Sequence, residues 1–130
     1  MSCGFLALAL GALAPAGAAP RDAGSSERRC GWYGNPTPGN AFLVDADGTW
    51  AISSQMEANG PNAHGLDRLS ALDDAERTRV GHGSHGDACV CLQARLRPSD
   101  MRIVDIESVT PLPLRTCRAD AALPPPPSGS

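Results

Sequence analysis

Residues 88–97 read ACVCLQARLR, and this stretch decides the fold. Apolar side chains recur at every second position, which is the period of a β-strand. They are Val90, Leu92, Ala94 and Leu96. Two cysteines, Cys89 and Cys91, fall on the opposite face of the same strand. We therefore predict a strand here whose apolar row faces the core and whose sulfurs tie distant segments to its outer face.

The cysteine count predicts a disulfide framework. Of five cysteines, Cys3 lies in the N-terminal segment that we expect to be cleaved, which leaves Cys30, Cys89, Cys91 and Cys117. An even set in a small exported protein is typical of disulfides. Cys89 and Cys91 are not expected to join each other, because a ring spanning one residue strains the bond. Two pairings stay open: Cys30–Cys89 with Cys91–Cys117, or Cys30–Cys91 with Cys89–Cys117. Loop-closure entropy gives roughly 3.5 to 4.5 kcal/mol per bridge in either case and does not choose.

The N-terminus predicts export. Residues 5–14 are apolar but too few to span a bilayer, and Ala16–Gly17–Ala18 has the small-x-small pattern of a cleavage site. We expect a signal peptide over 1–18. No second apolar run follows, so we expect no membrane span after cleavage and a periplasmic or secreted protein.

Composition narrows the class of protein. A chain of 130 residues allows one domain, and its net charge is -3. All of its basic residues are arginine, which with abundant Ala, Pro and Gly is typical of GC-rich bacterial coding. There is no basic patch, so we expect no nucleic-acid partner.

The chain divides into four segments. After the signal peptide we expect a disordered leader over 19–29, a disulfide-tied β domain over 30–118 and a Pro-rich disordered tail over 119–130. The fold class is mainly β: a small antiparallel sheet or partly closed barrel tied by two disulfides, with at most one short helix.

Within the domain, the expected elements follow the local pattern. Residues 31–40 hold two prolines, three glycines and two asparagines, which predicts an irregular segment. Residues 41–44 and 49–56 predict a hairpin around the turn 45–48, which lacks the further ligands of a calcium loop. Leucines at helical spacing over 66–72 predict a short helix. Residues 101–109 predict a second strand antiparallel to 88–97.

Several motifs together resemble a known family. They are Cys30-Gly31-Trp32, Asn35-Pro36-Thr37-Pro38-Gly39-Asn40, Asp47-Gly48-Thr49-Trp50, Ile52-Ser53 with Gln55, and Gly86 before Cys89-x-Cys91. Over about residues 30–117 the chain resembles the bacterial domain-of-unknown-function family 4087. The resemblance implies an exported bacterial domain and brings no activity, substrate or cofactor.

The first functional hypothesis is a non-enzymatic binding or interaction module, of which an inhibitor of an extracytoplasmic protein is one form. Small disulfide-tied β domains commonly bind through exposed loops. The candidate partner-binding residues are Trp32, Tyr33 and His85, and the partner is an unknown protein or small ligand in the cell envelope. Trp32 and Tyr33 have a second interpretation, as caps on the core. Ser, His and Asp in the loop 81–87 are too close along one segment for a catalytic triad, so we predict no catalytic residues and no cofactor.

Two alternatives stay open. The first is a metal-binding protein that uses His82 and His85, because imidazole suits zinc or copper. The second is a redox protein that uses the C-x-C pair, although reactive thiols need an electropositive setting and Asp87 offers the reverse.

Overall fold

The structure, a computed structural model, describes residues 24–37, 39–56, 61–78 and 86–128. The strands are β1 (Ser26–Thr37), β2 (Asn40–Asp45), β3 (Gly48–Ser53), β4 (Ala88–Arg97) and β5 (Arg102–Leu112). The helical segments are the 3-10 helices η2 (Leu66–Leu72) and η3 (Pro98–Asp100) and the short α-helix α1 (Leu114–Arg118). The described chain is therefore mainly β with one short α-helix, as predicted. Within this part of the chain no helix has the length and apolarity needed to cross a membrane.

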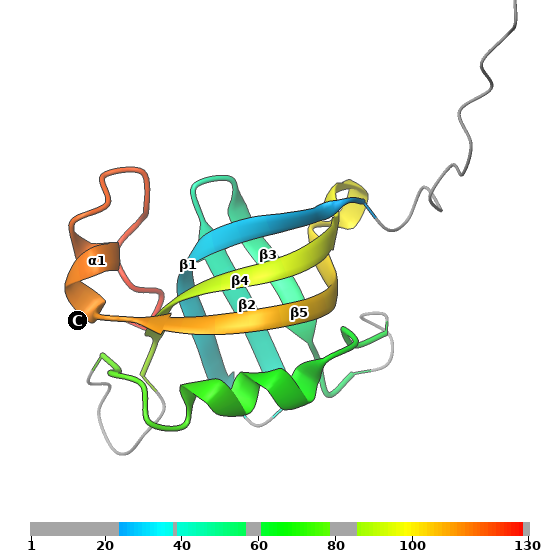
Figure 1. The fold of residues 1–130 in the computed structure, drawn as a ribbon, viewed down its shortest axis with the longest axis horizontal. Helices are drawn as coiled ribbons and strands as arrows, with labels where there is room; N and C mark the ends of the chain where they lie inside the picture. Colours follow the sequence, from blue (N-terminus) through cyan, green and yellow to red (C-terminus); the bar gives the residue numbers. More distant parts are fainter. Residues whose placement is uncertain (1–23, 38, 57–60, 79–85, 129–130) are drawn as a thin grey trace, which may run out of the picture.

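The five strands form one closed barrel in the order β1-β2-β3-β5-β4, with β4 pairing back to β1 (Figure 1). Every pair is antiparallel except β3 with β5, which meet in parallel at Ala51 and Arg102. The helix η2 lies between β3 and β4 in the chain and packs against β5. This connectivity is that of the oligonucleotide/oligosaccharide-binding fold, a five-stranded Greek-key barrel. A fold of this kind does not select a ligand by itself.

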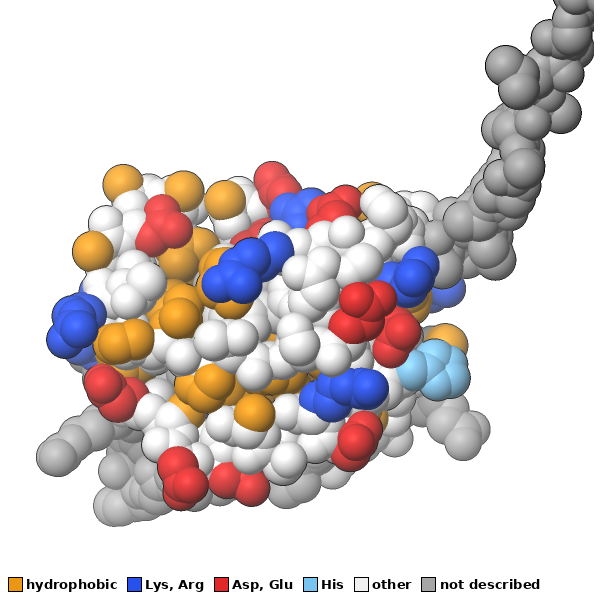
Figure 2. All heavy atoms as spheres, in the orientation of Figure 1, with side chains coloured by type: hydrophobic (Ala, Val, Ile, Leu, Met, Phe, Trp, Pro, Cys, Tyr) orange, Lys and Arg blue, Asp and Glu red, His pale blue; other side chains and the backbone are white. Residues whose placement is uncertain are grey.

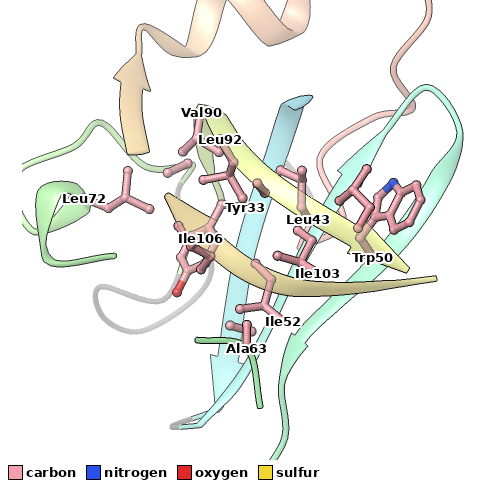
Figure 3. Packing of buried hydrophobic residues seen from close by; sticks show 14 residues of the cluster. Tyr33, Leu43, Trp50, Ile52, Ala63, Leu72, Val90, Leu92, Ile103 and Ile106 are labelled. Atoms are coloured by element: carbon pink, nitrogen blue, oxygen red, sulfur yellow. The ribbon is translucent and has the colours of Figure 1, made fainter. Parts of the chain in front are cut away.

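Alternation along the strands fills the inside of the barrel. The row predicted on β4 is buried throughout, and Leu43, Trp50, Ile52, Ile103 and Ile106 from the other strands complete the interior. Figure 3 shows these side chains pointing toward one another between the strands, with Leu72 of η2 closing one end. The period-2 pattern therefore placed the apolar face correctly.

The disulfides join Cys30 to Cys91 and Cys89 to Cys117. Cys30 and Cys91 are direct partners on β1 and β4, with Cα atoms 4.0 Å apart. Cys117 lies on α1, so the second bridge fastens the helix to β4. Of the two pairings that the sequence left open, the structure has Cys30–Cys91 with Cys89–Cys117. The C-x-C therefore fastens one segment from each end of the domain to β4.

A second apolar layer lies on the outside of the barrel. Trp32, Val44, Cys89 and Cys117 are buried together there, under α1 and the segment that follows it. The indole Nε1 of Trp32 donates to the carbonyl oxygen of Pro124 at 3.0 Å. The tail therefore packs on the barrel as far as Ser128, where we expected a disordered segment. Its order depends on tertiary contacts that local composition does not reveal.

The N-terminal part of the domain also differs from expectation. β1 begins at Ser26, within the segment expected to be a disordered leader, and continues through the stretch predicted to be irregular. A Cβ atom on Gly31 would lie 2.0 Å from the carbonyl oxygen of Val44, and one on Gly34 would lie 2.5 Å from the Phe42 ring. These glycines allow neighbouring groups to pack closely against a strand and do not form a turn. The prediction of an irregular segment, which rested on the glycine and proline content, was therefore wrong.

The remaining elements were predicted in outline. The hairpin of β2 and β3 turns at Asp45–Gly48, where Asp45 Oδ1 accepts from the Asp47 backbone N–H at 2.8 Å. The predicted helix over 66–72 is a 3-10 helix. The α-helix α1 was not predicted, because its first residue directly follows Pro113 in a run that reads as extended.

Candidate ligand cleft

An open cleft of about 670 Å³ lies between the end of β1 and η2. Its walls combine two side chains from β1 with residues on and just after η2. The lining residues are Tyr33, Asn35, Leu66, Asp67, Leu69, Ser70, Asp73 and Arg77. The cleft is built on the closed barrel, where Tyr33 pairs with Leu43 of β2 on one side and with Ala88 of β4 on the other.

The 3-10 geometry of η2 explains why two kinds of side chain share one cleft. In a 3-10 helix, residues i and i+3 eclipse each other and form straight rows. One row consists of Leu66, Leu69 and Leu72, of which Leu72 is buried in the core. The neighbouring row consists of Asp67, Ser70 and, at the end of the helix, Asp73. The cleft is therefore apolar along one row and rich in hydrogen-bond acceptors along the next. Several acidic side chains lie along the lower edge of Figure 2, where η2 runs.

Arg77 fixes one edge of the cleft. Its guanidinium donates to the carbonyl oxygens of Leu72 and Gly86, each at 3.2 Å, so it ties the end of η2 to the start of β4. Burial raises the pKa of Tyr33, and the positive charge of Arg77 partly opposes that rise. Tyr33 therefore stays a neutral phenol at neutral pH, able to donate or accept a hydrogen bond.

The structure separates the predicted partner-binding residues. Tyr33 lines the cleft although it is only 5% exposed. Trp32 is fully buried under the C-terminal segment. His85 lies outside the described residues, as does His82, so the metal hypothesis concerns a segment that the structure does not describe. Among the residues it does describe, no group of three or more His, Cys, Asp or Glu side chains could hold a metal ion.

The cysteines bear on the redox hypothesis. A C-x-C redox couple would join Cys89 to Cys91, whereas each is bonded to a distant partner. Cys89, Cys91 and Cys117 are buried and Cys30 is exposed. In this structure both bridges hold the fold together.

Sequence reasoning named only one residue of the cleft, Tyr33. The acidic side chains around η2 were not among the candidate binding residues. The signal that could have found them is the spacing of Asp67, Ser70 and Asp73 at i, i+3 and i+6 beside a leucine row. That spacing forms a straight row only in a 3-10 helix, and the sequence favours an α-helix equally.

Comparison with known proteins gives a family and no named relative. No curated protein and no solved structure matches the chain significantly. A family model described as a protein of unknown function, DUF4087, matches residues 24–124. Its bounds extend past residues 30–117 at both ends, so they include the first residues of β1 and reach Pro124, whose carbonyl oxygen accepts from Trp32. Since the match covers most of the 130 residues, the chain belongs to the DUF4087 family.

Proposed function

We propose that this protein is an exported, non-enzymatic interaction module that binds a basic side chain of an extracytoplasmic protein in the cleft beside η2. The observation that carries the proposal is the pairing of an acidic row with an apolar row in one open cleft. Lysine and arginine side chains have the complementary form, a methylene stem with a charged head.

The charges of the cleft favour a cation. The ionisable side chains that line the cleft, apart from Tyr33, are two carboxylates, those of Asp67 and Asp73, and one guanidinium, that of Arg77. Two of the Arg77 N–H groups are already used on backbone carbonyl oxygens. An amine or guanidinium from a partner would therefore meet acceptors that need donors. The chain's own net charge of -3 would also attract a basic partner.

The apolar row supplies the second half of the fit. Leu66 and Leu69 are partly buried against the core and line the same cleft. They offer a surface on which a methylene stem can pack while its charged head reaches Asp67 or Asp73. Such a contact is weak for one side chain, because exposed ion pairs contribute about 0.2–1 kcal/mol. Specificity would come from the rest of the partner's surface.

Two features support export. Disulfides persist outside the reducing cytoplasm, and this domain has two. Residues 1–18 have the sequence pattern of a signal peptide. A disulfide-clamped barrel would also keep the cleft rigid in the cell envelope.

Nuclear magnetic resonance titration tests the cleft directly. The probes are acetyl-arginine amide and acetyl-lysine amide, with acetyl-norleucine amide as the neutral probe of similar length. We expect the two cations to shift the backbone amide resonances of Asn35 and η2 and the neutral probe to leave them unchanged. Equal shifts with all three probes would contradict a cation site.

Charge-removal variants give the matched control. Asp67→Asn together with Asp73→Asn should abolish the shifts, because both carboxylates of the cleft are lost. Asp74→Asn removes a neighbouring exposed carboxylate that does not line the cleft, and it should leave the shifts intact. Loss of binding in both variants would mean that general surface charge, not the cleft, attracts the probes.

A further inference from the structure

The segment that follows α1 returns to the barrel and packs against its outer apolar layer. After α1 the chain reverses at Asp120, whose carbonyl and side-chain oxygens accept from the backbone N–H groups of Leu123 at 3.1 Å and Ala122 at 2.9 Å. Leu123 then packs against the outer apolar layer. Four prolines and Ser128 follow, and Figure 1 shows this red segment turning back toward the barrel from α1.

Two groups on the barrel hold this segment by hydrogen bonds. Trp32 Nε1 donates to the carbonyl oxygen of Pro124 at 3.0 Å. Four residues further on, the two Asp87 carboxylate oxygens accept from Ser128, Oδ2 from its backbone N–H and Oδ1 from its hydroxyl, each at 2.7 Å. Prolines between these points have no N–H groups, so the barrel needs no acceptors for them.

Asp87 has the character of a binding group rather than a surface charge. It is fully buried, and its backbone N–H donates to the Thr78 hydroxyl at 2.9 Å, which fixes its position at the start of β4. A buried carboxylate is costly unless hydrogen bonds satisfy it. The side-chain bonds found for it within the described chain come from Ser128. The site therefore selects a residue that offers both an N–H and an O–H group.

We infer that the face around Trp32 and Asp87 is a recognition site for a proline-rich segment of another protein, and that residues 123–128 occupy it as an internal ligand. The segment recognised has a leucine, a proline whose carbonyl meets Trp32, and a serine or threonine four residues after that proline. Aromatic side chains that receive proline-rich segments are a recurring mode of peptide recognition. The internal copy competes with an external one at an effective concentration in about the millimolar range.

The test uses the full-length, disulfide-bonded chain and a synthetic peptide of residues 120–128, acetyl-Asp-Ala-Ala-Leu-Pro-Pro-Pro-Pro-Ser-amide. In one variant, Gly and Ser replace residues 123–128 at equal length. The indole N–H resonance of Trp32 reports binding, and Trp50→Phe assigns it. We expect saturable binding of the peptide to this variant, with the indole resonance returning to its wild-type position. Binding to the wild-type chain should be at least about tenfold weaker, because the internal segment competes.

Two controls make the result decisive. A peptide ending in Ala instead of Ser should bind about tenfold or more weakly, because it loses a hydrogen bond to a charged group. Equal binding of both peptides would overturn the assignment to Asp87, and no binding despite intact disulfides would overturn the site. If the variant with the replaced tail does not fold, the Ser128→Ala variant of the otherwise native chain is used for the test instead. It should bind the serine peptide more tightly than the wild type does, and unchanged binding would contradict the inference.

Discussion

Trp32 and Cys89 lie directly opposite each other on β1 and β4, and both side chains are fully buried on the outer face of the barrel. A barrel strand normally presents its outer face to water, so this pair marks a second apolar layer. The Cys89–Cys117 bridge anchors α1 over that layer, and the Trp32 hydrogen bond to Pro124 holds the tail beside it. The outer disulfide and the tail therefore belong to one packing unit.

The two tryptophans should respond differently to the same substitution. Trp32 Nε1 has a hydrogen-bond partner, whereas Trp50 Nε1 is buried without one among the described residues, beneath the Arg29 guanidinium 5.2 Å from the ring centroid. Replacing either by Phe removes similar volume. Trp50→Phe also removes an unsatisfied donor, so it should destabilise less than Trp32→Phe by about 1–3 kcal/mol. Urea unfolding measures both, and equal losses would show that Trp50 Nε1 has a partner.

The strand glycines should differ in their tolerance of a methyl group. Gly31→Ala places Cβ against the backbone of β2, which cannot move without opening the sheet. Gly34→Ala places it against the Phe42 ring, a side chain that can rotate away. We expect Gly31→Ala to cost more than about 4 kcal/mol and Gly34→Ala to cost less. Thermal unfolding with both disulfides intact measures the difference, and a stable Gly31→Ala protein would contradict the register of β1 on β2.

Stability should fall at alkaline pH through Tyr33. Burial raises its pKa in the folded state above the ordinary 10.0. The unfolded state therefore loses the phenolic proton first, and the stabilisation present below pH 10 is lost as pH rises through the folded-state pKa. Tyr33 is the chain's only tyrosine, so ultraviolet absorbance of tyrosinate follows this group alone. Tyr33→Phe should remove this part of the pH dependence, and titration at the ordinary pKa would contradict the burial.

The strands that follow a strict alternation could be predicted from sequence. Ala88–Arg97 was predicted to the residue, because its apolar row and its two cysteines alternate without interruption. β1 could not be predicted, because Gly31 and Gly34 look like turn residues until Val44 and Phe42 are placed beside them. The pairing of the cysteines was also beyond the sequence, since Cys89 and Cys91 differ by only two positions and loop entropy treats them alike.

The functional surfaces were harder to predict for a similar reason. The cleft depends on the eclipsed rows of a 3-10 helix, and sequence spacing alone does not separate that helix from an α-helix. The order of the tail depends on Trp32 and Asp87, which are 92 and 41 positions away from Pro124 and Ser128. A Pro-rich composition reads as disorder unless such distant partners are known.

The two bridges should contribute by different routes. Loop-closure entropy for separations of 61 and 28 residues gives about 4.3 and 3.6 kcal/mol, which favours Cys30–Cys91. Both sulfurs of the Cys89–Cys117 bridge are packed in the outer apolar layer, so replacing both by Ala removes two buried sulfurs, whereas Cys30→Ala with Cys91→Ala removes one buried and one exposed sulfur. We expect the Cys89/Cys117 double variant to be the less stable of the two in urea unfolding. The reverse order would mean that entropy alone sets the contribution of each bridge.

Stepwise reduction of the native protein with peptide mapping tests the disulfide clamp most directly. Cys30 is exposed, whereas Cys89 and Cys117 are buried under α1 and the tail, so a mild reductant should open the first bridge before the second. A first label, added after mild reduction, should mark Cys30 and Cys91. A second label, added after full reduction, should mark Cys89 and Cys117. Finding Cys30 labelled together with Cys89, or finding these four thiols free before any reductant is added, would contradict the clamp.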